Sequence, residues 1–316
     1  MLEITQLKIA TRESALALWQ AEHVASCLRQ RHPNLHVSLV PMTTKGDQIL
    51  DRPLSQIGGK GLFLKELEQA MLAGSADCAV HSLKDVPMQL ESEFALAAIM
   101  TRASAFDALI VRDKSLQALM QLPLGARIGS SSQRRQVQLH ALRPDFELVD
   151  LRGNVNTRLR KLDDGEYDAI VLAQAGLDRL GFSDRASQVL AAPEFLPAAG
   201  QGALAIECLS ARPEVAALLA PLADYETTTC VRAERSLARA LEGSCQMPIA
   251  AFAELSDGHL RLQALLGDDC ARQFVRAELS GRAEQAEALG TALALKLREL
   301  AFAQGFVNLK HVANQQ

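Results

Sequence analysis

The sequence predicts an α/β protein with a smaller α+β domain at its C-terminal end. Apolar runs typical of buried strands alternate with amphipathic helical runs through the first two-thirds of the 316 residues. This alternation is typical of βαβ units, so we expect a mainly parallel sheet with helices on both faces. The last third combines helices with short alternating strands. Because the length exceeds what one hydrophobic core normally reaches, we expect two or three domains.

The strand-like runs of the first two-thirds are short and apolar, with helical stretches between the first of them. The predicted strands are Leu7–Ala10, Val37–Val40, Cys78–His81, Ala108–Val111, Ile128, Leu148–Leu151 and Ala169–Leu172. The helical stretches run from about Ser14 to Arg29 and from about Leu62 to Leu72. In sheets of this kind, ligands bind at the carboxyl ends of the strands. The residues that follow the strands are therefore of most interest.

The last third begins with a capped helix from about Thr228 to Leu241. Short alternating strands follow, and Asp257-Gly258 is typical of a hairpin turn between two of them. A long helix from about Ala283 to Ala301 comes next. Proline, glycine and polar residues place the domain boundaries near 101–106, 194–202 and 221–226.

Composition excludes several classes of function. The net charge of −4 provides no basic field to bind nucleic acid, and aromatic residues, at 4% of the chain, provide few stacking platforms for bases. No run approaches the roughly 18 apolar residues of a membrane span, and no signal peptide is recognisable. The six cysteines form no CxxC pair and show no metal-ligand spacing. We therefore expect a cytoplasmic protein with reduced thiols and no metal site, which binds neither nucleic acid nor membrane.

Two segments place arginines where a helix begins, the end that normally disfavours positive charge. They are residues 129–135 (Gly-Ser-Ser-Ser-Gln-Arg-Arg) and 151–158 (Leu-Arg-Gly-Asn-Val-Asn-Thr-Arg). The placement becomes favourable if an anion lies between the helix end and the guanidinium groups. The alternative, which is more common for any single arginine, is a solvated basic loop.

Two more strand ends carry cations, Arg12 before a helix that Ser14 could cap, and Lys84 beside Asp85. If these groups converge, each pair about 8 Å apart would cost roughly 2 kcal/mol of repulsion at an effective dielectric constant of about 20. An anionic ligand would relieve that repulsion. Phosphate-binding motifs are absent, since residues 58–61 have the wrong spacing for a P-loop, and this weakly favours carboxylates.

Asp85 and Cys245 are the candidates for chemistry. Asp85 follows a buried strand among cations, so it is either an ion-pair partner or a carboxylate that moves a proton and stabilises a developing cation. The two interpretations are compatible. Cys245 lies on a loop framed by glycine and proline, where a thiol can be a nucleophile or merely incidental. Cys270, also on a loop, ranks lower because its acidic neighbours disfavour the thiolate.

Five motifs in this order together resemble the porphobilinogen deaminases, also called hydroxymethylbilane synthases. The motifs are residues 58–63 (Gly-Gly-Lys-Gly-Leu-Phe), 81–87 (His-Ser-Leu-Lys-Asp-Val-Pro), 131–135 (Ser-Ser-Gln-Arg-Arg), 151–154 (Leu-Arg-Gly-Asn) and 241–246 (Leu-Glu-Gly-Ser-Cys-Gln). The resemblance runs from about Lys8 into the C-terminal domain. It implies two doubly wound α/β domains of the periplasmic-binding-protein type with the cleft between them, plus a smaller C-terminal α+β domain. The implied domains are 1–101 with 202–219, then 106–195, then 224–316.

The resemblance also implies an enzyme of tetrapyrrole and heme biosynthesis. Such an enzyme joins four porphobilinogen molecules head to tail, releases ammonia at each step, and hydrolyses the linear product from a dipyrromethane cofactor. Cys245 falls at the position that holds this cofactor through a thioether. Asp85 falls at the position of the catalytic carboxylate, which assists loss of ammonia and stabilises a positively charged azafulvene.

Binding roles carry over to the residues at the strand ends. Each pyrrole ring bears an acetate and a propionate, which suits arginine. The implied cofactor-binding residues are Lys84, Ser130, Ser132, Arg134, Arg135 and Arg158. The implied substrate-binding residues are Arg12, Ser14, Arg152, Arg158 and Arg179. Lys60 and Phe63 would lie on a mobile loop. Gln56 and Gln133 depart from the common pattern, and so does Ser130, which keeps the hydroxyl of a frequent threonine.

The resemblance implies a monomer whose partner is the small-molecule substrate. The alternative function is a non-catalytic binding protein for a small polycarboxylate, built on the same two-domain architecture. Such a binding protein needs no loop cysteine, so Cys245 distinguishes the two hypotheses.

Overall fold

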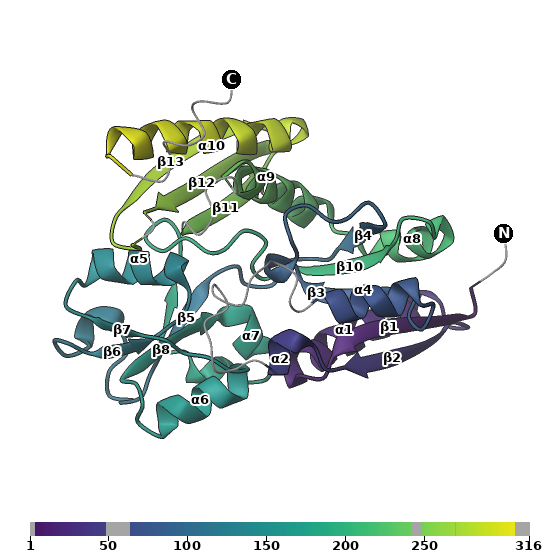
Figure 1. Cartoon of the computed structure of the whole chain (residues 1–316), viewed down its shortest axis with the longest axis horizontal. Helices are drawn as coiled ribbons and strands as arrows, with labels where there is room; N and C mark the ends of the chain where they lie inside the picture. Colours follow the sequence, from purple (N-terminus) through teal and green to yellow (C-terminus); the bar gives the residue numbers. More distant parts are fainter. Residues whose placement is uncertain (1–3, 49–63, 242–247, 269, 307–316) are drawn as a thin grey trace. The chain divides into compact units, whose positions relative to one another are not determined.

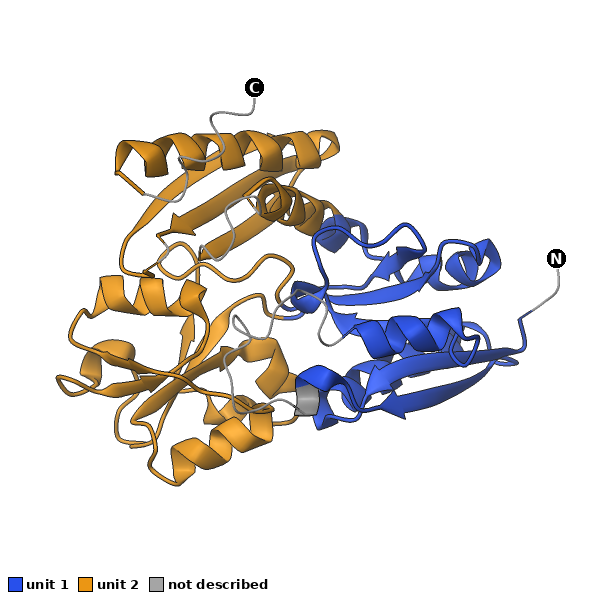
Figure 2. Cartoon of the chain, viewed as in Figure 1, with its two compact units in different colours: residues 1–103, 202–228 blue, residues 104–201, 229–316 orange. Residues whose placement is uncertain are grey.

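The computed structural model describes residues 4–48, 64–241, 248–268 and 270–306. It consists of two compact units (Figure 2). Unit 1 contains residues 1–103 and 202–228, and unit 2 contains residues 104–201 and 229–316. Gln56, Lys60, Phe63 and Cys245 lie outside the described residues.

The sheet of unit 1 has five strands in the order β2-β1-β3-β10-β4. Their bounds are β1 Gln6–Arg12, β2 His36–Met42, β3 Cys78–Ser82, β4 Phe94–Ile99 and β10 Leu204–Leu209. Strands β2, β1 and β3 are parallel, whereas β10 is antiparallel to both of its neighbours. The carboxyl ends of β1 and β3 therefore lie at the same edge of the sheet.

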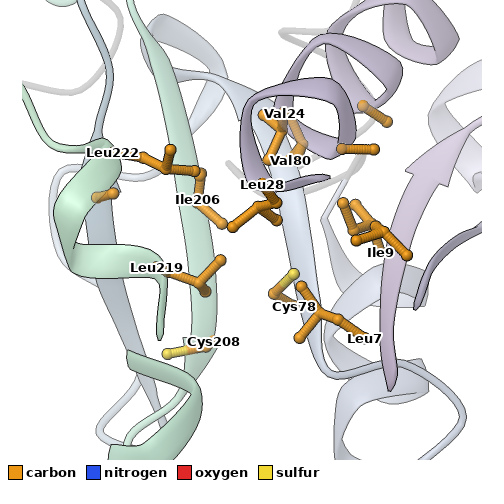
Figure 3. Packing of buried hydrophobic residues seen from close by; sticks show 14 of the residues in the cluster. Leu7, Ile9, Val24, Leu28, Cys78, Val80, Ile206, Cys208, Leu219 and Leu222 are labelled. Carbon is orange, nitrogen blue, oxygen red and sulfur yellow. The ribbon is translucent and has the colours of Figure 1, made fainter. Parts of the chain in front are cut away.

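Successive side chains of a strand point to opposite faces of the sheet, so alternate residues of the strands in unit 1 pack in two separate hydrophobic cores. Ile9 packs in the core formed with helix α1 (Ala15–Arg31) and helix α8 (Pro213–Leu219), shown in Figure 3. The neighbouring Ala10 packs in a second core with Leu67 and Met71 of helix α4 (Lys65–Leu72). A short helix, α2, covers Lys45–Gln48. The sheet is therefore covered by helices on both faces.

The first sheet of unit 2 repeats this plan in the order β7-β6-β8-β5-β9. Its strands are β5 Asp107–Val111, β6 Arg127–Gly129, β7 Glu147–Val149, β8 Ala169–Ala173 and β9 Gln188–Leu190, and its helices are α5 Gln133–Leu142, α6 Val155–Asp163 and α7 Gln174–Arg179. Strands β7, β6 and β8 are parallel, and β5 is antiparallel to β8 and β9. Leu139 of α5 packs in one core, and Leu159 of α6 with Leu177 of α7 packs in another.

The C-terminal part of unit 2 is a three-stranded antiparallel sheet. Its strands are β11 Ile249–Ser256, β12 His259–Gly267 and β13 Phe274–Arg282. Helix α10 (Ala286–Ala303) lies along the sheet (Figure 1), and helix α9 (Tyr225–Leu241) comes before it in the chain. The predicted hairpin turn is confirmed, since Asp257 and Gly258 both have a positive φ between β11 and β12.

The two doubly wound sheets and the α+β end confirm the predicted fold class. The expectation of mainly parallel sheets is confirmed, because four strands of each five-stranded sheet run in one direction and a single strand, β10 or β5, runs in the opposite direction. Strand β10 enters unit 1 from a distant part of the chain, so no local pattern could indicate its direction. The division into three domains stays a prediction, since the structure separates two units.

Replacing Gly290 of α10 by alanine should destabilise unit 2. A Cβ at this position would meet the carbonyl oxygen of Ala233 and lie 2.9 Å from the backbone nitrogen of Leu237, both on α9. We expect urea denaturation to show a loss of about 1–3 kcal/mol in unfolding free energy from overpacking. Alanine is the better helix former by about 1 kcal/mol, so a stabilised variant would show that α9 and α10 are not in close contact. Ala288→Gly, on the exposed face of α10, measures the propensity term alone.

Candidate functional site

Four predicted site residues lie at the carboxyl ends of β1 and β3 in unit 1, which we call the first edge. They are Arg12, Ser14, Lys84 and Asp85. Ser14 caps α1, and its hydroxyl accepts a hydrogen bond from the backbone N–H of Ala17 at 3.4 Å, which confirms the predicted cap. The parallel pairing of Ile9 with Cys78 and of Ala10 with Ala79 brings the two strand ends side by side.

A short 3-10 helix, Leu83–Asp85, presents Lys84 and Asp85 at the first edge. Leu83 is fully buried, and its N–H donates to the carbonyl of Ala203 at 3.0 Å. Val86, only 1% exposed, anchors the other end of this turn. Asp85 itself is exposed and Lys84 is half-buried. The turn therefore holds a solvent-accessible carboxylate on a backbone that is fixed on both sides.

A buried hydrogen-bonded pair of side chains lies on the strands next to this turn. Nε2 of His81 on β3 lies 2.9 Å from Oε2 of Glu207 on the neighbouring strand β10. Oε1 of Glu207 is buried and has no hydrogen-bond partner among the described residues. Burial and the charge of Glu207 raise the pKa of Glu68 on α4. The pair links the strand that leads to Asp85 with the strand that completes the sheet.

The other predicted binding residues lie at the carboxyl ends of β6, β7 and β8 in unit 2, which we call the second edge. They are Ser130, Ser132, Arg134 and Arg135 after β6, Arg152 and Arg158 after β7, and Arg179 at the end of α7, which follows β8. Because β6 lies between β7 and β8 and all three strands are parallel, these segments emerge at one side of the sheet. Within each unit, the structure thus brings the predicted residues together.

Arg134 and Arg135 are buried and share one carboxylate. Nη1 of Arg134 donates to Oδ2 of Asp107 at 2.8 Å. Nη2 and Nε of Arg135 donate to Oδ1 of Asp107 at 2.7 and 3.1 Å. The arginines are each 6% exposed, and Asp107 is fully buried at the start of β5. They are therefore fixed side chains of the sheet edge and not parts of a solvated loop.

This cluster keeps an excess of positive charge, because two guanidinium groups and one carboxylate sum to +1. Burial alone would raise the pKa of Asp107, but the charges and hydrogen bonds of Arg134 and Arg135 hold it well below its ordinary value. Burial lowers the pKa of Arg134, and Asp107 opposes that effect. Nε and Nη2 of Arg134 donate no hydrogen bond to any described residue. The cluster can therefore bind an anion.

The remaining arginines of the second edge are half-buried. Nε of Arg158 donates to the carbonyl of Gly153 at 2.7 Å, and Asn154 caps α6 through a 2.9 Å bond from the N–H of Thr157 to its Oδ1. Burial lowers the pKa of Arg179 to about 10, with Asp178 opposing the effect, so Arg179 remains charged at neutral pH. These groups suit carboxylates, because arginine keeps its charge in partly buried sites.

Sequence reasoning missed Asp107, Gln201 and Glu207. Asp107 directly precedes the apolar run Ala108–Val111, where its side chain resembles an ordinary strand start. Nε2 of Gln201 donates to Oδ1 of Asp107 at 2.9 Å, whereas the sequence suggested only a linker at that point. All three residues make their contacts with residues that are distant in the sequence. The one available signal was the position of Asp107 directly before an apolar run.

Metal-binding clusters and membrane-spanning helices are both absent from the part of the chain that the structure describes. No group of three or more histidine, cysteine, aspartate or glutamate side chains there is arranged to hold a metal ion. In the same ranges, every helix is too short or too polar to cross a bilayer.

Two family models match the chain. The first, described as porphobilinogen deaminase, dipyromethane cofactor binding domain, matches residues 7–217. The second, described as porphobilinogen deaminase, C-terminal domain, matches residues 228–299. Together they cover both edges and the segment that contains Cys245.

Curated relatives of similar length carry the same name. A porphobilinogen deaminase of Xanthomonas euvesicatoria is 58% identical over 302 residues, which are 95% of this chain and 98% of the relative. One from Stenotrophomonas maltophilia is 58% identical over 288 residues, 91% of this chain and 94% of the relative. Among solved structures, a periplasmic sulfonate-binding protein from Methylobacillus flagellatus covers 69% of this chain and 67% of its own, with a TM-score of 0.41 and 14% identity.

Removing the cap of α6 should destabilise the turn that carries Arg158. In Asn154→Ala, the N–H of Thr157 loses its acceptor, and we expect a loss of about 1 kcal/mol in unfolding free energy by urea denaturation. Ser132→Ala is the matched control, because Ser132 stands at the N-cap of α5 without a side-chain cap bond. Equal losses in the two variants would contradict the capping role of Asn154.

Proposed function

The chain belongs to the porphobilinogen deaminase family and is a hydroxymethylbilane synthase, and we propose that the residues of its two edges bind the ligands and perform the chemistry. The enzyme is a transferase that condenses four porphobilinogen molecules head to tail on a dipyrromethane cofactor, with release of ammonia. The observation that carries the site proposal is the buried arginine pair of Arg134 and Arg135, with its net charge of +1 and the unused donors of Arg134.

The second edge fits the cofactor. A dipyrromethane has two pyrrole rings, each with an acetate and a propionate, so it needs several fixed cationic donors. Nε and Nη2 of Arg134 are such donors, held in place by the bonds that its Nη1 makes. Ser130 and Ser132 add hydroxyl groups beside the same helix start. We assign the cofactor's carboxylates to Ser130, Ser132, Arg134, Arg135 and Arg158, together with Lys84 of the first edge.

Arg12, Ser14, Arg152, Arg158 and Arg179 are the proposed substrate-binding residues. Porphobilinogen carries one acetate and one propionate, and a charged hydrogen bond to such a group is worth roughly 1.5–3 kcal/mol. Several of these bonds orient the pyrrole and retain the growing chain. Capping of α1 by Ser14 and of α6 by Asn154 fixes the helix starts that present these groups.

Asp85 is the proposed catalytic carboxylate. When bound, the dipyrromethane supplies the pyrrole carbon to which the first substrate is joined. As the carbon–nitrogen bond of the substrate breaks and ammonia leaves, positive charge develops on the pyrrole ring. The exposed carboxylate of Asp85 stabilises that charge beside the ring nitrogen. Because Leu83 and Val86 anchor its turn, Asp85 needs little reorganisation during the step.

Cys245 is proposed as the residue that attaches the cofactor through a thioether, and Lys60 and Phe63 as parts of a mobile loop. These residues lie outside the described part of the chain, so their support is the sequence resemblance alone. A monomeric state is proposed on the same basis, whereas a cytoplasmic location and an absence of nucleic-acid partners are proposed from the composition and charge of the sequence. The alternative of a non-catalytic polycarboxylate binder is not favoured, because relatives at 58% identity are named for the enzyme.

Intact-mass measurement tests the attachment at Cys245. Protein from cells that make porphobilinogen should exceed the chain mass by two pyrrole units, and Cys245→Ala should lack this adduct because the nucleophile is gone. Cys270→Ala removes an exposed thiol elsewhere and should keep the adduct. An adduct that survives in Cys245→Ala, or wild-type protein without one, contradicts the assignment.

Steady-state kinetics tests Asp85. Asp85→Asn removes the charge from an exposed side chain, so the fold and the adduct should persist while kcat falls by about 10²-fold or more. Glu91→Gln, an exposed carboxylate of unit 1 outside the first edge, should keep the wild-type rate. A near-normal kcat in Asp85→Asn would show that the carboxylate is not catalytic.

A further inference from the structure

We propose that Asp107 is the positioning residue of the cofactor site, which orients Arg134 and Arg135 and sets their joint charge so that they bind the cofactor's carboxylates. The inference rests on the proposed cofactor-binding role of these arginines. Asp107 itself does not touch the cofactor in this proposal, because it is fully buried beneath the two guanidinium groups.

The geometry of Asp107 fixes one side of each guanidinium group. Its Oδ2 accepts from Nη1 of Arg134, and its Oδ1 accepts from Nε and Nη2 of Arg135. Nε2 of Gln201 also donates to Oδ1, at 2.9 Å, and to the carbonyl of Ala105 at 2.8 Å. The carboxylate is thus held by three side chains and has no alternative orientation that keeps these bonds.

Backbone carbonyls complete the arrangement. Nη1 of Arg134 also donates to the carbonyl of Leu196 at 2.7 Å, and Nη1 of Arg135 donates to the carbonyl of Val171 at 2.9 Å. Both hydrogens of Nη1 in Arg134 are then used, which leaves Nε and Nη2 as its remaining donors. The plane of the group, and with it the direction of those donors, is fixed before a ligand arrives.

The same contacts extend to the C-terminal sheet. The carbonyl of Leu196 also accepts from Nε2 of Gln138, and Oε1 of Gln138 accepts from the N–H of Leu196 and from Nη2 of Arg276 on β13. The arginine pair therefore lies in a network that spans both sheets of unit 2. That network joins the proposed cofactor-binding pair to the sheet that follows Cys245 in the chain.

The charge of Asp107 matters as much as its geometry. Without it, two buried guanidinium groups would repel each other with a charge of +2. With a second acid, the cluster would be neutral and would not attract a carboxylate. One carboxylate between two arginines reduces their mutual repulsion and so stabilises the protein without cofactor. The cluster keeps a net charge of +1, which still attracts an anionic group.

Cofactor loading tests this inference. Wild type, Asp107→Asn and Asp107→Glu are prepared without cofactor, from cells unable to make porphobilinogen, and are then given porphobilinogen. The rate of adduct formation is followed by intact mass, and the rise in Tm on loading by thermal denaturation. Asp107→Asn should load about tenfold more slowly or worse, with a smaller rise in Tm, because the donors are no longer oriented. Asp107→Glu keeps the charge and should recover part of the rate.

The matched control is Asp168→Asn. Asp168 also pairs with two arginines of unit 2, Arg112 and Arg127, at 3.0 and 3.7 Å. The Asp168→Asn variant should be less stable than wild type but should still bind the cofactor at the wild-type rate. Wild-type loading in Asp107→Asn, or an equal loss of loading in Asp168→Asn, overturns the inference. If Asp107→Asn does not fold, Asp107→Glu decides, since loading at the wild-type rate with the carboxylate displaced excludes a positioning role. A wild-type protein that forms no adduct contradicts the proposed function instead.

Discussion

The second edge depends on one buried carboxylate that faces two buried guanidinium groups. Arginine in the first turn of a helix is unfavourable, because the helix dipole and unpaired N–H groups already make that end positive. Asp107, at the start of β5, compensates by pairing with both Arg134 and Arg135. This pairing permits a cationic helix start to exist in the protein interior. A removed partner would leave an uncompensated buried charge, which is among the costliest defects in a protein.

Much of the fold was predictable from local patterns. Apolar runs at Leu7–Ala10, Cys78–His81 and Ala169–Leu172 correspond to β1, β3 and β8, because a strand covered by helices on both faces is apolar along its length. The hairpin at Asp257-Gly258 was predictable because few residue pairs favour a positive φ. The arginines at helix starts were equally visible. These features depend on residues close together in the sequence.

The features that could not be predicted from the sequence depend on contacts between residues that lie far apart in the chain. Asp107 lies 27 residues before Arg134, and Gln201 reaches Asp107 across 94 residues. His81 and Glu207 pair across 126 residues, because β10 joins the sheet between β3 and β4. No periodicity or spacing encodes such contacts. As a result, the sequence showed which residues bear charge at the strand ends but not which acid balances them.

The place of β10 in the sheet has a consequence for synthesis of the chain. Strand β10 lies between β3 and β4, yet it begins at Leu204, after the strands and helices of the first sheet in unit 2 have been made. On the ribosome, β3 and β4 therefore present unpaired backbone edges while about a hundred further residues emerge. Such edges can pair with other chains until they are covered. Unit 1 can therefore complete its sheet only once the strand that bears Glu207 has left the exit tunnel.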